Sequence, residues 1–229
     1  MDPKQAAKYF KPLSLKLPLI LLAIGILTLM AGFAGSVEMV VVGLIFAGLG
    51  GFLLYNQTQG RPTDADIDQA IQAVAGGARE QGLARVGLDE SEVNLIQPVV
   101  IPGPDLRNSR GMVKKGKDGV LRAAANEVLV LYFSENEVHS YTHQFNITDP
   151  TVRRESTDEY FYRDIVSVST VSDPERVTLP TGESLEVNWD RFRLTTSGGT
   201  SISVAAYNAG ELSQSIQGMR ALIKQRKLL

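Results

Sequence analysis

Two long apolar segments near the N-terminus stand out against a more polar remainder. Residues 13–34 contain one charged residue, Lys16, and residues 37–55 contain one, Glu38. Each segment is about 20 residues long, which at about 1.5 Å per helical residue crosses the hydrocarbon core of a bilayer. Since only a short turn around Gly35 and Ser36 separates them, the pattern predicts two transmembrane helices joined as a hairpin.

The flanking charges predict the orientation of this hairpin. Lysines at positions 4, 8, 11 and 16 precede or open the first segment, the turn has no Lys or Arg, and Arg61 follows the second segment. The positive-inside rule therefore places both chain ends in the cytoplasm. A cleaved signal peptide would share the basic start and the first apolar run, but here a second run follows at once. A buried hairpin of a soluble protein is a further alternative.

Small residues recur along the second apolar segment. Gly43, Ala47 and Gly51 follow one another at intervals of four residues, a spacing that lets another helix approach closely. This helix-packing stripe has two interpretations: it packs on the first helix of the same chain, or it mediates self-association in the membrane.

The region between the hairpin and the β-rich part, residues 59–90, is predicted to be a linker with short juxtamembrane helices. Thr63 and Asp66 have the spacing of a capping box, and apolar residues at helical spacing extend the helix to about Ala75. Gly76 and Gly77 weaken it, and the pattern resumes at residues 78–83. A further helical turn is expected at residues 89–92.

Alternation of apolar and polar residues dominates the rest of the chain and predicts about seven strands. The predicted strands are residues 95–101, 126–133, 137–147, 159–171, 175–179, 185–196 and 200–206. Ile216, Met219 and Ile223 then share one face of a C-terminal helix. The fold class is therefore α+β: a transmembrane hairpin at residues 1–58, the linker at 59–90, and a β-rich domain with a C-terminal helix at 91–229.

Three sequence segments, residues 132–134, 159–168 and 216–219, carry a resemblance to a known family. The segment Glu159 to Val168, EYFYRDIVSV, is similar to the signature of an uncharacterised family of bacterial membrane-anchored proteins with a domain like the pleckstrin-homology (PH) domain. The resemblance covers residues 90–229. It implies a PH-like barrel closed by its C-terminal helix, in a protein of the bacterial inner membrane, and it implies no catalytic residues. A β-sandwich with a packed helix is the alternative fold.

Composition and motifs exclude several kinds of binding and catalytic site. The net charge is −2, which does not favour nucleic acid, and the absence of cysteine excludes disulfides and thiolate sites. His139 and His143 are the two histidines; at i and i+4 of a strand they lie about 13 Å apart, too far to share one metal ion. No nucleophile elbow or phosphate-binding glycine loop is present. We therefore expect a protein that is not an enzyme and has no cofactor and no identified small-molecule substrate.

Two surfaces are candidates for binding. Residues 105–122 contain six basic and two acidic residues, and within them residues 107–122 are called the basic loop here. Its cations could touch anionic lipid or lie in solvent; those proposed for lipid contact are Arg107, Arg110, Lys114, Lys115 and Lys117. Tyr160 and Tyr162 share one face of a predicted strand, as core residues or as a partner surface.

These patterns predict a membrane-anchored interaction or scaffold module. It would bind a protein partner or a second copy of itself on the cytoplasmic face. The alternative is a module that senses anionic lipid through the basic loop.

Overall fold

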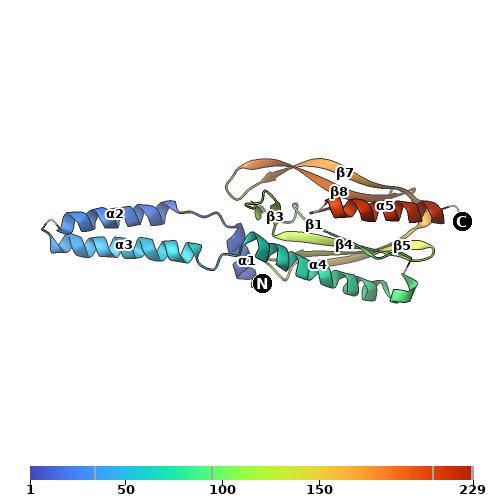
Figure 1. Cartoon of the computed structure of the whole chain (residues 1–229), viewed down its shortest axis with the longest axis horizontal. Helices are drawn as coiled ribbons and strands as arrows, with labels where there is room; N and C mark the ends of the chain where they lie inside the picture. The colour runs from blue at the N-terminus through green and yellow to red at the C-terminus, as the bar shows by residue number, and fades with distance from the viewer. Residues whose placement is uncertain (34, 94, 208, 228–229) are drawn as a thin grey trace. The chain divides into compact units, whose positions relative to one another are not determined.

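The chain divides into two units, and the division does not follow the order of the sequence. The computed structural model describes residues 1–33, 35–93, 95–207 and 209–227 (Figure 1). One unit is Lys11–Pro62, and the other combines Met1–Phe10 with Thr63–Leu229. The first ten residues therefore belong to the domain that follows the hairpin, rather than to the hairpin segment that was predicted at residues 1–58.

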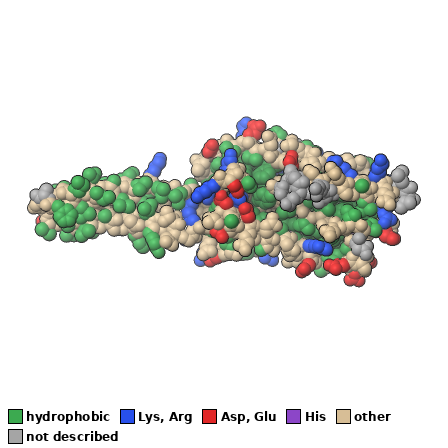
Figure 2. Space-filling model, in the orientation of Figure 1, with side chains coloured by type: hydrophobic (Ala, Val, Ile, Leu, Met, Phe, Trp, Pro, Cys, Tyr) green, Lys and Arg blue, Asp and Glu red, His purple; other side chains and the backbone are tan. Residues whose placement is uncertain are grey.

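The smaller unit is a pair of apolar helices, α2 (Lys16–Phe33) and α3 (Val37–Thr58). Ser36 caps α3, and its hydroxyl accepts a hydrogen bond from the Met39 amide at 3.4 Å. Most side chains of both helices are exposed, and Figure 2 shows hydrophobic side chains covering their visible face. Both helices are long and apolar enough to cross a membrane.

Glycines let α2 and α3 pack backbone to backbone. A Cβ atom at Gly43 would lie 2.7 Å from the Leu29 amide nitrogen, and one at Gly50 would lie 2.7 Å from that of Leu22. Ala47 faces Gly25 in the same way. By contrast, a Cβ at Gly51 would meet nothing within 4 Å. Gly43 and Ala47 thus pack inside the hairpin, while Gly50, not Gly51, completes the stripe, because i, i+4 and i+7 stay closer to one face than i+8.

Enlarging the interface glycine should therefore separate the helices. We expect Gly43→Leu to destabilise the hairpin by about 1–3 kcal/mol through overpacking. Gly51→Leu is the matched control and should change stability by less than about 0.5 kcal/mol. Titration of the full chain with SDS in mixed micelles, followed by far-UV circular dichroism, measures both; equal effects would contradict the observed packing face.

The larger unit contains a four-stranded antiparallel sheet in the order β1-β4-β5-β6. The strands are β1 (Val99–Pro104), β4 (Ala125–Phe133), β5 (Glu137–Asn146) and β6 (Arg153–Phe161). The 3-10 turn η1 (Glu90–Glu92) precedes β1 and confirms the predicted helical turn there.

One long helix, α4 (Asp64–Val86), covers one face of this sheet (Figure 1). Its buried residues, among them Ile67 and Ile71, pack with Val128, Val130 and Tyr132. The helix runs through Gly76 and Gly77 without a break, and Gly82 lies so close to the Tyr132 and Tyr141 side chains that no Cβ would fit. The expectation of short linker helices at residues 59–90 is wrong, because packing on the sheet outweighs the low helix propensity of glycine.

The opposite face of the sheet contributes to a second core. A three-stranded sheet of order β7-β8-β9 and the C-terminal helix α5 (Ala209–Arg226) supply the other side. The strands are β7 (Ile165–Thr178), β8 (Ser184–Thr196) and β9 (Ser201–Ala205), and the 3-10 turn η2 (Tyr162–Asp164) leads from β6 into β7. Leu129, Leu131, Phe192, Leu194 and Met219 are fully buried here.

A two-stranded hairpin, β2 (Val113–Lys115) with β3 (Leu121–Ala123), is inserted between β1 and β4. Its Val113 and Leu121 pack against Trp189 and Val177 of the long β7–β8 hairpin. From residue 113 onward the basic loop is therefore a folded hairpin that shares a small core with the β7–β8 hairpin.

The α+β class is confirmed, whereas a closed barrel is not shown. The described strands form three open sheets. β1 and β9 approach each other without a ladder: the Tyr207 amide donates to the Pro102 carbonyl at 3.2 Å, and the backbone of Ala205 fills the space where a Cβ of Gly103 would lie. The four-stranded sheet, with the β2–β3 hairpin inserted in it, precedes the three-stranded sheet and α5 along the chain. The turn η2 divides the continuous strand that was expected at residues 159–171 into the end of β6 and the start of β7.

Candidate functional site

The short helix α1 (Pro3–Phe10) docks onto the domain. Tyr9 and Phe10 are buried in the same cluster as Ile67 and Ile71 of α4, with their rings edge to face at 5.0 Å. Apolar side chains on one face of α1 thus meet the first turns of α4. The two segments of chain that flank the hairpin are consequently parts of one core.

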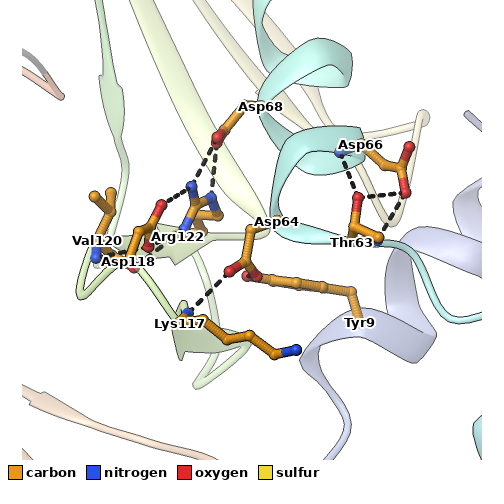
Figure 3. Close-up of polar contacts among 9 residues, drawn as sticks. All are labelled: Tyr9, Thr63, Asp64, Asp66, Asp68, Lys117, Asp118, Val120 and Arg122. Atoms are coloured by element: carbon orange, nitrogen blue, oxygen red, sulfur yellow. Dashed lines mark hydrogen bonds and ion pairs between the residues drawn. The ribbon is translucent and has the colours of Figure 1, made fainter.

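Asp64, in the first turn of α4, receives hydrogen bonds from two directions (Figure 3). The Tyr9 hydroxyl donates to Oδ1 at 2.7 Å, and the Lys117 amide donates to Oδ2 at 2.9 Å. Both bonds lower the pKa of Asp64, and the bond from Tyr9 has the larger effect. Burial raises the pKa of Tyr9. One carboxylate thus connects α1, α4 and the basic loop. It stands beside the predicted capping box, which is confirmed: Thr63 and Asp66 hydrogen-bond each other's backbone.

Arg122 of β3 forms the centre of this region (Figure 3). Its Nε and Nη2 donate to the two carboxylate oxygens of Asp68, both at 2.7 Å, and Nη1 and Nη2 donate to Asp118 at 3.0 and 2.7 Å. The Arg122 side chain is only 3 % exposed. Its hydrogen bonds lower the pKa of Asp118 to about 2. Because charge-assisted bidentate pairs fix geometry as well as energy, they orient β3 on α4.

We call this group of polar contacts the clasp. It consists of Tyr9, Asp64, Asp68, Lys117, Asp118 and Arg122. Its members come from α1, the first turns of α4, and the β2–β3 hairpin, so it joins segments that are more than 50 residues apart in sequence.

The structure separates the cations of the basic loop into two groups. Arg107, Arg110, Lys115 and Lys117 have exposed side chains. The ammonium of Lys114, in contrast, lies 3.8 Å from the centre of the Tyr9 ring. A cation over an aromatic face is attracted by its quadrupole. Four of the five predicted lipid-contact residues are therefore on the surface, and Lys114 contacts α1.

Tyr160 lies at the end of β6 and Tyr162 begins the 3-10 turn η2, so they do not share one strand as predicted, and both are buried. They are 5 % and 2 % exposed and belong to the core between the two larger sheets, where the Tyr162 hydroxyl donates to the Ser134 carbonyl at 2.9 Å. The interpretation of these tyrosines as a partner surface is wrong. The exposed ring of this segment is Phe161, at 45 %.

The two histidines occupy buried positions on β5. His139 lies 3.4 Å from a carboxylate oxygen of Glu137 and 3.8 Å from one of Glu159. Burial lowers the pKa of His143. Among the residues that the structure describes, no group of three or more His, Cys, Asp or Glu side chains is placed to hold a metal ion.

Comparison with family models, with curated proteins and with solved structures finds no match to this chain. The clasp and the surfaces around it therefore carry the functional argument. Of the clasp, sequence patterns indicate only the start of α4. Asp64 and Asp68 at i and i+4 lie on one face of that helix, but nothing local pairs them with Tyr9 or Arg122.

Removing the Arg122 guanidinium should weaken the domain. We expect Arg122→Ala to lower the free energy of unfolding by about 1–3 kcal/mol, since Asp68 and Asp118 lose a shared partner but keep partial access to water. Arg110→Ala removes an exposed cation of the same loop and should cost less than about 0.5 kcal/mol. Thermal unfolding of the full chain in detergent measures the difference, and limited proteolysis should cut near residues 11–16 sooner in the Arg122 variant. Equal behaviour of the two variants would rule out the clasp as a stabilising element.

Proposed function

We propose that this protein is a membrane-anchored interaction module. α2 and α3 cross the membrane as a hairpin, and the domain lies on the cytoplasmic side of a bacterial inner membrane, where it binds a protein partner or a second copy. The observation that carries the proposal is the clasp, because it places the segments before and after the hairpin in one folded domain.

The clasp supports a double crossing by a simple topological argument. Two membrane spans return the chain to the side from which it started, so α1 and α4 can share a core. A single span, or a leader removed after the first apolar segment, would part α1 from the domain that buries Tyr9 and Phe10. The lysines at positions 4, 8, 11 and 16 and the uncharged turn favour the cytoplasm for that side.

The order of elements supports a PH-like domain. The four-stranded antiparallel sheet, interrupted by the β2–β3 hairpin, is followed by the three-stranded sheet, and α5 then packs Ile216, Met219 and Ile223 into the core between these two sheets. A helix with one apolar face covers the open end that two such sheets leave. The resemblance of residues 159–168 to bacterial PH-like proteins agrees with this order, and such domains resemble protein-interaction or oligomerisation modules more often than lipid-headgroup sensors.

The clasp also suggests what the anchor contributes. The chain enters and leaves the hairpin from the same domain, at Phe10 and at Thr63, so two attachment points keep the domain beside the membrane. Because confinement to one membrane raises the effective concentration of its neighbours there, it favours partners that are themselves membrane-bound.

Mass measurement of the intact assembly tests the proposal. The full chain, cross-linked in its native membrane and extracted in mild detergent, should run as a complex larger than its 24.9 kDa monomer. Gly51→Leu fills the outer side of α3 and leaves the domain intact. Persistence of the complex in this variant would assign association to the domain. A monodisperse monomer without a co-purifying protein would contradict the proposal.

The exposed cations favour one second candidate, contact with anionic lipid. Lys117 donates its amide to Asp64, which lies two residues beyond the hairpin unit, so Lys115 and Lys117 are tied to the point where the chain leaves that unit. Each cation near an anionic surface contributes about 1 kcal/mol.

Lysine labelling in nanodiscs separates this candidate from the first. In discs containing phosphatidylglycerol, acylation of Lys115 and Lys117 should be several-fold slower than in phosphatidylcholine discs at low salt, and high salt should abolish the difference. Lys224, exposed on α5, is the internal control. Equal labelling in both lipids would leave the basic loop as a solvated surface.

A further inference from the structure

The far half of the β7–β8 hairpin has one unpaired edge. β9 pairs with β8 only along Arg191–Thr195, and the Ala206 amide makes one further bond, to the Asp190 carbonyl at 2.9 Å. The chain then departs at Tyr207, whose hydroxyl is bonded to Asn126. Among the described residues, β8 from Ser184 to Trp189 pairs with β7 on one side and with no strand on the other.

The register determines which backbone groups face this open side. Leu179 donates to the Glu183 carbonyl at 2.8 Å, so the odd-numbered residues of this part of β8 exchange hydrogen bonds with β7. The bond from Ala206 to Asp190 shows that even-numbered residues face the β9 side. The N–H and C=O groups of Glu186 and Asn188 consequently point to the open side, where no backbone partner is described.

A hollow with a volume of 390 Å³ follows this edge; we call it the β8 groove. Residues 185–190 of β8 form one wall, and Lys115, Val120 and Leu121 of the β2–β3 hairpin form the other. Trp189 and Tyr207, with rings edge to face at 6.2 Å, also line it. The Gly116 amide bonds to the Val120 carbonyl at 2.8 Å, which turns the backbone groups of Leu121 away from β2.

The opposite edge of the same hairpin, formed by β7, contains a proline. Pro174 of β7 stands opposite Asn188 and occupies a position whose N–H would point outward. Proline has no such donor, and edge prolines are a common means of preventing strand addition. The β8 edge carries no proline between Ser184 and Asp190. One edge of the hairpin is thus protected, while the other keeps its donors beside a groove.

We propose that the β8 groove binds an extended peptide segment of a protein partner as an added strand. This rests on the proposed function as an interaction module and specifies its partner. The strand occupies the row that β9 leaves empty, with its backbone bonded to Glu186 and Asn188. The residue opposite Val187 lies on the face that packs on the small core around Trp189, so it is apolar.

The carboxylates on the outer face of β8 determine which side chains the peptide needs on that face. The residue of the added strand that lies opposite Glu186 shares the outer face with this carboxylate and with that of Asp190, whose own opposite position is filled by Ala206. Lys115 is the one cation among the residues lining the groove. Basic residues complement this surface, because cross-strand pairs of opposite charge are favourable and like charges are not. The partner segment is therefore an alternation of apolar and basic residues.

A synthetic hexapeptide of alternating lysine and valine, blocked at both ends, tests this with the full chain in detergent. Trp189 is the only tryptophan, so its fluorescence reports occupancy of the groove directly. We expect saturable binding. Asn188→Pro, which removes an outward donor without touching the ladder to β7, should weaken it at least about tenfold, a loss of about 1.4 kcal/mol.

The controls separate strand addition from simple attraction. Ser172→Pro removes an outward donor from the opposite edge of the hairpin and should leave the affinity unchanged. The same peptide with alternate backbone nitrogens methylated keeps its charge and apolar side chains but should not bind. Circular dichroism confirms that both proline variants are folded.

Hydrogen exchange supplies an independent readout. Peptide binding should slow exchange at the amides of Glu186 and Asn188 and leave that of Arg176 on β7 unchanged. Equal binding by Asn188→Pro, equal binding of the methylated peptide, or absence of binding would overturn the inference. So would protection of these amides by increasing protein concentration alone, because a second copy would then occupy the groove. If a partner co-purifies equally with Asn188→Pro, this inference fails while the proposed function stands.

Discussion

The organisation of the domain depends on the hydrogen bonds that the buried guanidinium of Arg122 donates to Asp68 and Asp118. A charge removed from water is tolerated only when partners replace its hydration, and Asp68 and Asp118 supply four hydrogen bonds between them. These bonds fix β3 against α4, and Asp64 joins the same region to Tyr9 and Lys117. Helix, inserted hairpin and N-terminal segment therefore hold one another in place.

Two consequences follow from that arrangement. The basic loop, which by composition resembles a flexible segment, forms from residue 113 onward a hairpin whose Val113 and Leu121 pack on the β7–β8 hairpin. It thereby forms one wall of the β8 groove. The helix α4, which directly follows the apolar pair, becomes one layer of the domain, because burial of its apolar face on the sheet outweighs the cost of two adjacent glycines.

The two edges of the β7–β8 hairpin show how a protein can protect one strand edge and leave another available. Pro174 removes a donor on one side, whereas β9 ends early on the other. The available edge lies over a core that already contains Trp189 and Val187, so an added strand would extend an existing apolar surface. Main-chain bonding then supplies affinity, and the alternation of side chains supplies selectivity.

The sequence by itself determined the features that local pattern controls. Two runs of about 20 apolar residues indicate helices able to cross a membrane, alternation indicates strands, and a periodic stripe indicates α5. Thr63 and Asp66 even locate the start of α4, because a capping box is a contact between residues three apart. These signals depend on residues that are close in sequence, so they can be recognised without knowledge of the fold.

Only the tertiary structure decided which surfaces are buried and which distant groups meet. Strand alternation predicts one face for Tyr160 and Tyr162 but cannot say that both belong to the core, because that depends on the sheet placed opposite. Asp68, which pairs with Arg122, and Asp64, which bonds to Tyr9, lie 54 and 55 residues away along the chain, beyond any local signal. The open edge of β8 likewise exists because β9 ends and the chain turns away, which is a property of packing and not of residues 184–190 themselves.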